Sequence, residues 1–267
     1  MSFFWIYDLP NWALALLTLL VCCGLSMAGL LASRSLVRRS FGPPPGHNDV
    51  VSYYLGAFGV FYGLTIGLIA VATWQNLSDM EELVQQEASA LRVLDRSVSG
   101  YPEPARSELH RQLRAYVTVV IEEEWPAQAR GEVPEAGTRP IDAFEETLTA
   151  FEPATAGQQA LHAETLRAYS NYEALRRQRL YSVGTGLPEV VWYVLLIGAA
   201  LNICLTYLFS VERLGAHVVL TLTLSVFVAL LIFLIAAMDH PFRGDFSVGP
   251  DAFRAAREQM LTESPSP

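Results

Sequence analysis

One face of a long uncharged stretch, residues 51–74, carries side chains that could guide an ion through a membrane. A turn of about 100° per residue aligns a stripe of aromatic, hydroxyl, aliphatic and amide groups there. The stripe comprises Phe58, Tyr62, Thr65, Ile69 and, just beyond the stretch, Asn76. An apolar constriction can gate a pore by dewetting, and side-chain oxygens can contact the ion. The sequence favours a pore-lining stripe, and an ordinary packed helix face remains the alternative.

Three carboxylates follow this stripe, at Asp79, Glu81 and Glu82. If the helix were repeated around a symmetry axis, these side chains would form a charged ring at the mouth of the path, and such a ring attracts cations. The sequence therefore predicts a weak preference for cations.

Small residues line another face of the same stretch, turned by roughly 140° from the stripe at about 100° per residue. They are Gly56, Gly59, Gly63 and Gly67. Glycines at this spacing let helix backbones approach closely in lipid, where packing holds helices together. The glycine face could seat sister subunits or serve a tightly packed monomeric bundle.

Two further residue pairs resemble metal ligands or catalytic groups: His47 with Asp49, and Asp239 with His240. A layout with four crossings would place them on opposite membrane faces, so we interpret them as helix-end and turn residues. The run 122–124 of three glutamates is read as a solvated helix end rather than a cation site. No Ser-His-Asp set, phosphate-binding glycine loop or Cys/His cluster occurs in the sequence. We expect no enzymatic activity, no metal site and no cofactor.

The composition indicates a membrane protein with a polar portion. Hydrophobic residues make up 52% of the 267 residues, and charged residues make up 17%. The formal net charge is −9, and all 18 basic residues are arginine. A nucleic-acid partner would require a basic patch, and the sequence contains none.

The apolar stretches predict an all-α membrane protein with four transmembrane helices and a helical stalk between the second and third. Each stretch is about 20 residues long, enough to cross a bilayer. They cover residues 12–32, 51–74, 190–209 and 218–238. The predicted parts are an N-terminal interfacial segment, first transmembrane helix and basic proline-rich linker (1–50), the pore-lining helix (51–75), the stalk (76–187), the third and fourth transmembrane helices (188–238), and a C-terminal turn and tail (239–267).

The stalk pattern predicts long helices without strands. No helix breaker follows Trp74, so the second span should continue to about Gly100, although Glu87 occupies a slot where an apolar residue is expected. A second helix should end near the sequence Glu-Glu-Glu-Trp-Pro at 122–126, and a short helix should cover about 141–151. Thr155 should cap a last helix over about 156–184. The tail after the fourth span is polar and is expected to be disordered.

Several motifs in order along the chain resemble the bestrophin-like domain family, first described as a domain of unknown function. They are His47-Asn48-Asp49-Val50, the run Gly59–Gly67, Glu124-Trp125-Pro126, Gly186-Leu187-Pro188 with Trp192, and Asp239-x-Pro241-Phe242-x-Gly244. The chain is more distantly similar to bestrophins, which are pentameric chloride channels, gated by calcium in animals, with the second span lining the pore.

The resemblance implies a homo-oligomeric channel of about four or five copies in a bacterial-type inner or plasma membrane, since one helix per subunit must enclose the path. Its partners would be sister subunits, the lipid bilayer and the permeating ion, and its stalk would lie in the cytoplasm. The acidic run that holds calcium in animal bestrophins is absent, because Asp245 and Asp251 stand apart. The acidic mouth also speaks against chloride selectivity. A non-conducting scaffold or sensor that binds a partner through the stalk remains the alternative function.

Overall fold

The computed structural model describes residues 6–7, 9–40 and 46–262, and Trp5 of the predicted interfacial segment lies outside them. The regular elements in these ranges are helical, and none of them is a strand. The chain divides into two compact units. The first contains residues 1–75, 186–239 and 244–246, and the second contains 76–185, 240–243 and 247–267.

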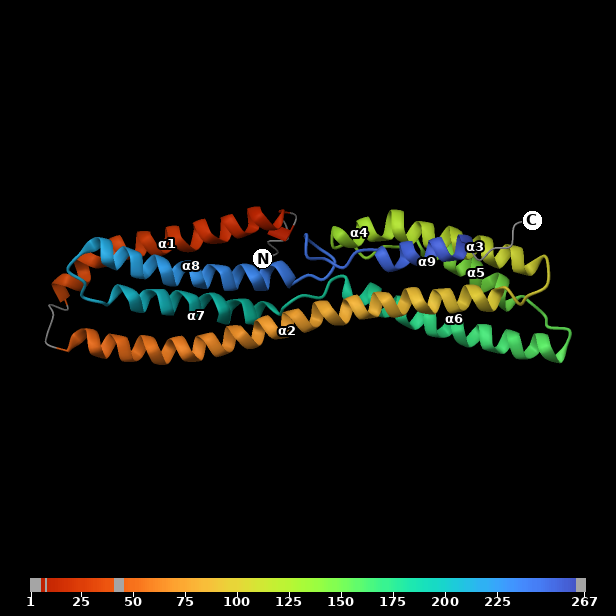
Figure 1. Ribbon diagram of the computed structural model, residues 1–267, viewed down its shortest axis with the longest axis horizontal. Coiled ribbons are helices and arrows are strands. Elements are labelled where there is room, and N and C mark those ends of the chain that lie inside the picture. Colours follow the sequence, from red (N-terminus) through yellow and green to blue (C-terminus); the bar gives the residue numbers. More distant parts are fainter. Residues whose placement is uncertain (1–5, 8, 41–45, 263–267) are drawn as a thin grey trace. The chain divides into compact units, whose positions relative to one another are not determined.

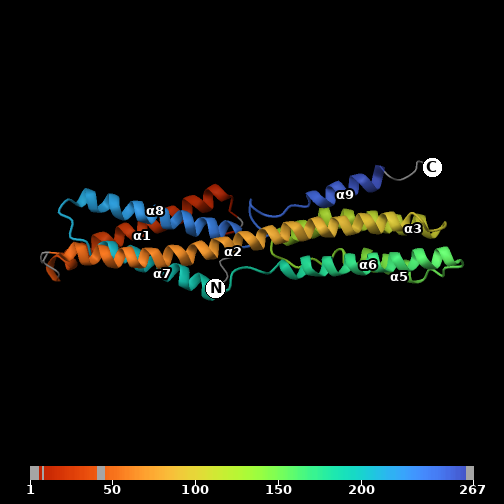
Figure 2. The same cartoon turned by 60° about the horizontal axis from the view of Figure 1, so that its bottom comes forward.

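The first unit holds the helices that are long and apolar enough to cross a membrane. Four helices of the described chain meet this criterion, and they are α1 (Asn11–Ser40), α2 (His47–Val98), α7 (Glu189–Tyr207) and α8 (Leu214–Met238). Helix α1 packs on α8 and α7, and α7 also packs on α8 (Figures 1 and 2). A small apolar core centred on Ile66, Leu195 and Ile235 joins α2, α7 and α8.

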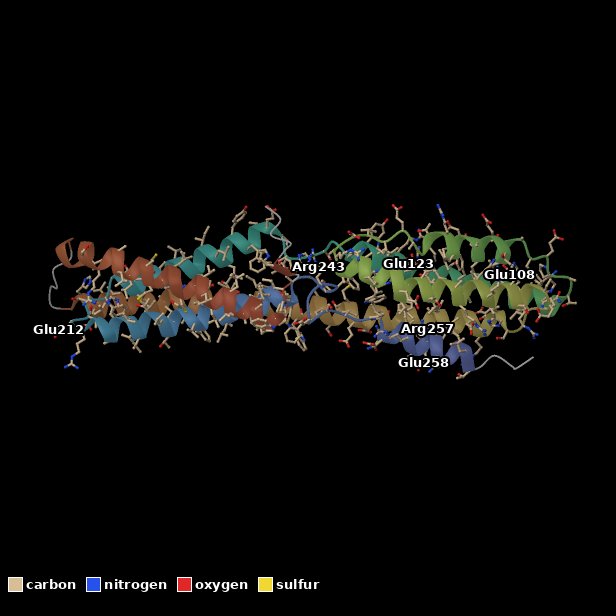
Figure 3. All side chains as sticks on the ribbon, turned by 90° about the horizontal axis from the view of Figure 1, so that it is seen from above. Glu108, Glu123, Glu212, Arg243, Arg257 and Glu258 are labelled. Carbon is tan, nitrogen blue, oxygen red and sulfur yellow. The ribbon has the colours of Figure 1, made fainter. Side chains whose placement is uncertain are left out.

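The second unit is a helical assembly with a continuous apolar core. Its elements are the remainder of α2, α3 (Ala105–Val119), the π-helical turn η2 (Val120–Glu124), α4 (Trp125–Ala129), α5 (Thr138–Thr149), α6 (Ala156–Ser182) and α9 (Asp251–Thr262). Helix α3 buries Leu109, Leu113 and Tyr116, a spacing that places them on one helical face. The outer faces of the helices in this unit carry charged side chains. Figure 3 labels four of them, Glu108, Glu123, Arg257 and Glu258.

The sequence-derived elements differ from the structure in several places. The first span, predicted for residues 12–32 and followed by a basic linker, continues as α1 to Ser40, since no proline interrupts residues 11–42. The helix predicted to end at Pro126 continues to Ala129, because the proline falls in the first turn of α4, where no intrahelical N–H bond is required. The expectation of a disordered tail is wrong for residues 251–262, which form α9. This helix is amphipathic and buries Phe253, Ala256 and Met260. Three apolar residues in a short polar segment are too few to predict a helix from the sequence.

Thr155 begins α6 as predicted, and its cap offers a first test. Its hydroxyl accepts the Gln158 N–H at 3.2 Å, and the Gln158 side chain accepts the backbone N–H of Thr155 at 3.3 Å. Thr155→Ala removes half of this capping box and should destabilise the second unit by about 1 kcal/mol. Thermal unfolding of the purified protein measures the change. Thr155→Ser keeps the hydroxyl and should unfold close to the wild-type temperature; an equal loss in both variants would contradict the cap.

Candidate functional site

Helix α2 is the least covered of the membrane-span candidates. Only 6% of its most apolar 18-residue window is buried inside the chain, against 33% for α8. Its N-terminal half still packs along one stripe, where Ile66 is 2% exposed. The remaining faces require apolar surroundings, either lipid or other protein.

The packed stripe includes two residues of the predicted pore wall. The Tyr62 hydroxyl donates to the Leu195 carbonyl at 3.1 Å, and its ring lies against Gly198, where an added Cβ would approach within 2.6 Å. Ile69 packs against the apolar core of the first unit. Tyr62 and Ile69 therefore face α7 and the bundle core within one subunit.

The other predicted wall residues have a more open setting. Phe58 is 43% exposed, and Thr65 is exposed while its hydroxyl donates to the Phe61 carbonyl at 2.8 Å. Asn76 is half-buried. The structure thus does not bring the five stripe residues to one surface within a subunit, and their role in a pore wall stays a prediction.

The glycine face is open along most of its length. A Cβ added at Gly56, Gly63 or Gly67 would meet no atom within 4 Å, and one added at Gly59 would lie 4.0 Å from Asn202 Oδ1. The subunit itself therefore makes little use of the close approach that these glycines permit. The Asn202 amide donates to the Gly198 carbonyl of its own helix.

Large apolar side chains occupy the face of α2 opposite the packed stripe, a surface that sequence analysis did not single out. Val60, Leu64 and Leu68 are 63–70% exposed. They are turned by roughly 120° to 200° from Ile66 at about 100° per residue. In sequence this face looks like the rest of an apolar helix. It is identified only once the structure shows which stripe of α2 the other helices cover.

The predicted charged mouth lies on the continuation of α2 into the second unit. Asp79, Glu81 and Glu82 are all exposed there. Glu82 accepts the side-chain amide of Gln86 at 3.0 Å, one turn further along. Because α2 is unbroken from His47 to Val98, these carboxylates follow the apolar stretch on the same helix.

The histidine and aspartate pairs serve as connectors, in line with the helix-end interpretation. Asn48 exchanges two hydrogen bonds with the backbone of Ser210, at 3.0 and 2.9 Å, and the His47 ring contacts the Leu208 carbonyl at 2.8 Å. Asp239 accepts the Tyr7 hydroxyl and the Leu187 N–H, each at 2.6 Å. These contacts fix the ends of the apolar helices.

A buried ion cluster in the second unit was not anticipated, because the glutamate run was read as solvated. Glu122 and Glu123 are exposed, but Glu124 is fully buried. The Arg179 guanidinium donates to both carboxylate oxygens of Glu87, at 2.7 and 3.2 Å, and to Glu124 at 2.9 Å. The apolar slot occupied by Glu87 was the signal for such a partner.

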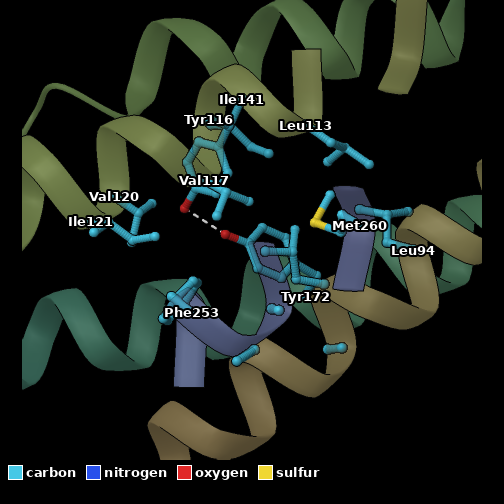
Figure 4. Packing of buried hydrophobic residues seen from close by; sticks show 14 of the residues in the cluster. Leu94, Leu113, Tyr116, Val117, Val120, Ile121, Ile141, Tyr172, Phe253 and Met260 are labelled. Atoms are coloured by element: carbon cyan, nitrogen blue, oxygen red, sulfur yellow. Dashed lines mark hydrogen bonds between the residues drawn. The ribbon is translucent and has the colours of Figure 1, made fainter. Parts of the chain in front are cut away.

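Aromatic residues and a second arginine enclose the cluster. The Tyr172 hydroxyl donates to Tyr116 (Figure 4), and Arg176 Nε donates to the same Tyr116 oxygen at 3.1 Å. The Arg179 guanidinium carbon lies 5.2 Å from the Trp125 ring centroid and 5.6 Å from that of Phe253. These contacts join α2, α3, η2, α4, α6 and α9 around two buried arginines and two buried carboxylates.

Burial and the neighbouring charges shift the titration of this cluster. Burial opposes the charged form of Arg179, but the carboxylates of Glu87 and Glu124 outweigh it and raise the pKa of the guanidinium well above its usual value. Burial raises the pKa of the Glu87 carboxyl, against the attraction of Arg179. The ion pairs therefore depend on Arg179 remaining in place.

The fold and this site define a class: all-helical proteins that combine a bundle of membrane-span candidates with a charged helical unit. The chain belongs to the Bestrophin-like domain family, whose model matches residues 15–253. The earlier resemblance to that family is thereby confirmed.

Solved structures share the fold at low sequence identity. A bacterial bestrophin homologue from Klebsiella pneumoniae, in a leucine-to-threonine variant, matches with a TM-score of 0.67 and 12% identity over 93% of this chain and 98% of its own. An isoleucine-to-threonine variant matches with a TM-score of 0.64 and 13% identity over 92% and 99% of the two chains. A crystal structure of a membrane protein matches with a TM-score of 0.67 and 13% identity over 93% and 97%. The comparison with curated proteins found no match.

Proposed function

We propose that this chain is a subunit of a homo-oligomeric ion channel in which the α2 helices surround the ion path. The observation that carries the proposal is the exposure of α2 in the single subunit. Only 6% of its most apolar window is buried, and three of its glycines have open space beside them. A lipid-facing helix does not require small residues, whereas close contact between helices does.

The covered stripe of α2 suggests an orientation within the ring. If the other helices of each subunit lie outward, Val60, Leu64 and Leu68 face the axis, since they lie opposite the stripe that packs on those helices. The glycine side then meets the next subunit, and Phe58 and Thr65 lie on the other flank. An apolar constriction of this kind can gate by dewetting. Tyr62 and Ile69 would support the wall from behind.

The remaining features complete the proposed layout. The four apolar helices cross the membrane, the second unit lies in the cytoplasm, and about four or five copies enclose the path in a bacterial inner membrane. The carboxylates of Asp79, Glu81 and Glu82 form the mouth and favour cations.

Current recording across a planar bilayer that contains the purified protein tests the channel and its mouth. We expect conductance with a reversal potential displaced toward potassium in a potassium chloride gradient. Changing Asp79, Glu81 and Glu82 together to Asn, Gln and Gln should move that potential toward chloride, because the fixed negative charge is gone. Glu132→Gln, which removes an exposed carboxylate outside α2, is the control. A sealed protein with no conductance would instead favour a scaffold or sensor.

A further inference from the structure

We propose that a pocket between α2 and α9 binds a small oxyanion that carries a phosphate group. The pocket has a volume of about 210 Å³. It is lined by Ser89, Arg92, Val93, Asp95, Arg96, Gln259 and Met260. A water molecule occupies about 30 Å³ in the liquid, so the pocket has room for a phosphate group with bound water.

The charge pattern of the second unit singles out this pocket. Many exposed or half-buried arginines of the unit pair with a neighbouring carboxylate. These pairs are Arg106–Glu103, Arg111–Glu108, Arg130–Glu132, Arg167–Glu164, Arg177–Glu173, Arg254–Asp251 and Arg257–Glu122. Arg92, Arg96 and Arg139 have no carboxylate partner within the described chain, although the protein carries an excess of acidic residues. Of these three, Arg92 and Arg96 line the same pocket. Two unpaired arginines beside one pocket in an acidic protein indicate a site for an anion.

The spacing of the two arginines strengthens this inference. They lie four residues apart on α2, so their side chains neighbour each other on one face of the helix. Like charges at this spacing repel, and an anion held between them removes the repulsion. The Arg92 guanidinium is held at one edge of the pocket by its 2.8 Å hydrogen bond to Gln259 Oε1.

Two further polar side chains of the pocket suit an anion. The amide nitrogen of Gln259 and the hydroxyl of Ser89 can donate hydrogen bonds, and arginine forks match the oxygens of a phosphate group. Asp95 is the carboxylate in the lining; it is 6% exposed, and its Oδ1 lies 2.7 Å from His110 Nδ1. One oxygen of Asp95 is therefore engaged by His110, on α3.

Binding of pyrophosphate to the full-length protein in detergent, measured by calorimetry, tests the proposal independently of conduction. Arg96→Gln should weaken binding at least about tenfold, because the charge-assisted hydrogen bonds of the Arg96 guanidinium to the phosphate oxygens are lost. Arg96→Lys keeps the positive charge but not the forked guanidinium, so its affinity for pyrophosphate should lie between those of the wild type and of Arg96→Gln. Arg167→Gln on α6 is the matched control, since that arginine already has a carboxylate partner.

A second arm distinguishes the source of the phosphate group. Short-chain phosphatidic acid replaces pyrophosphate, with a short-chain phosphatidylcholine as the zwitterionic comparison. If pyrophosphate binds the wild type and not Arg96→Gln, the result supports a soluble ligand. If phosphatidic acid, but not pyrophosphate, binds the wild type and not Arg96→Gln, the result supports a lipid headgroup. Absence of binding for both, or binding that the Arg96 variants leave unchanged, overturns the site. Channel activity can be present or absent in either case.

Discussion

Replacing Arg179 by methionine is expected to destabilise the second unit by about 3 to 5 kcal/mol, because it leaves the buried carboxylates of Glu87 and Glu124 without their main partner. At about 2 to 4 °C per kcal/mol for a chain of this size, the melting temperature should fall by roughly 6 to 20 °C. Differential scanning fluorimetry of the detergent-solubilised protein measures the shift.

The loss should grow with pH. In the variant the attraction of Arg179 is gone, so burial and the neighbouring Glu124 raise the pKa of Glu87 further above the unfolded value, against the weaker attraction of Arg176. The folded state then keeps its full stability only below that unfolded value. As the pH rises through the folded pKa, the buried Glu87 carboxyl must ionise without the Arg179 guanidinium, and stability falls. The melting temperature of Arg179→Met should therefore lie further below that of the wild type at pH 8 than at pH 5.

Two comparisons isolate the cluster. Arg167→Met removes an exposed arginine of the same helix, whose pair with Glu164 is solvated, and should cost less than about 1 kcal/mol. Adding Glu87→Gln to Arg179→Met removes one of the stranded charges and should restore part of the loss. Equal melting temperatures for Arg167→Met and Arg179→Met would show that the cluster does not hold the unit together.

Introducing leucine at Gly63 is expected to disrupt assembly and ion flux while leaving the subunit folded. The site has open space in the subunit, so the side chain fits there. Against the α2 helix of a neighbouring copy it would force the backbones apart, at about 1 to 3 kcal/mol for each contact. Leucine is also the better helix former, so a loss cannot be ascribed to a weakened helix. Size-exclusion chromatography with light scattering and liposome flux provide the measurements.

Two other glycines provide the matched controls. Gly24 on α1 also has open space beside it, and Gly24→Leu should leave both assembly and flux unchanged if that face meets lipid. Gly198→Leu should instead damage the subunit itself, because a Cβ there would lie 2.6 Å from the Tyr62 ring. A Gly63→Leu protein that assembles and conducts as the wild type does would refute the proposed contact between α2 helices.

Sequence patterns were informative wherever one physical signal dominated. The four apolar stretches were recognised from the sequence, because length and lack of charge suffice to identify such segments. The end of α1 was not, since the helix continues to Ser40, past the predicted end at residue 32. The continuation of α2 beyond Trp74 followed from unbroken apolar spacing, and the structure ends it at Val98. The Thr155 cap depends on local hydrogen bonds alone.

Features that depend on distant partners were not accessible in the same way. The spacing of Phe58, Tyr62 and Ile69 identifies a stripe, but only the positions of α7 and α8 determine which part of it is covered. Glu124 resembles its neighbours Glu122 and Glu123 in sequence, and its burial follows from Arg179, 55 residues away. Helix α9 likewise depends on the apolar surface that receives Phe253.

The contact between α9 and the ion cluster has a practical consequence for handling the protein. Phe253 covers Arg179, so the last helix insulates a charged centre from solvent. The carboxyl terminus is therefore a poor attachment point for a bulky fusion or affinity tag. A tag that displaces α9 would expose the buried cluster of Arg179, Glu87 and Glu124 to water. A protein with such an extension should be compared with the untagged chain before its behaviour is ascribed to the native protein.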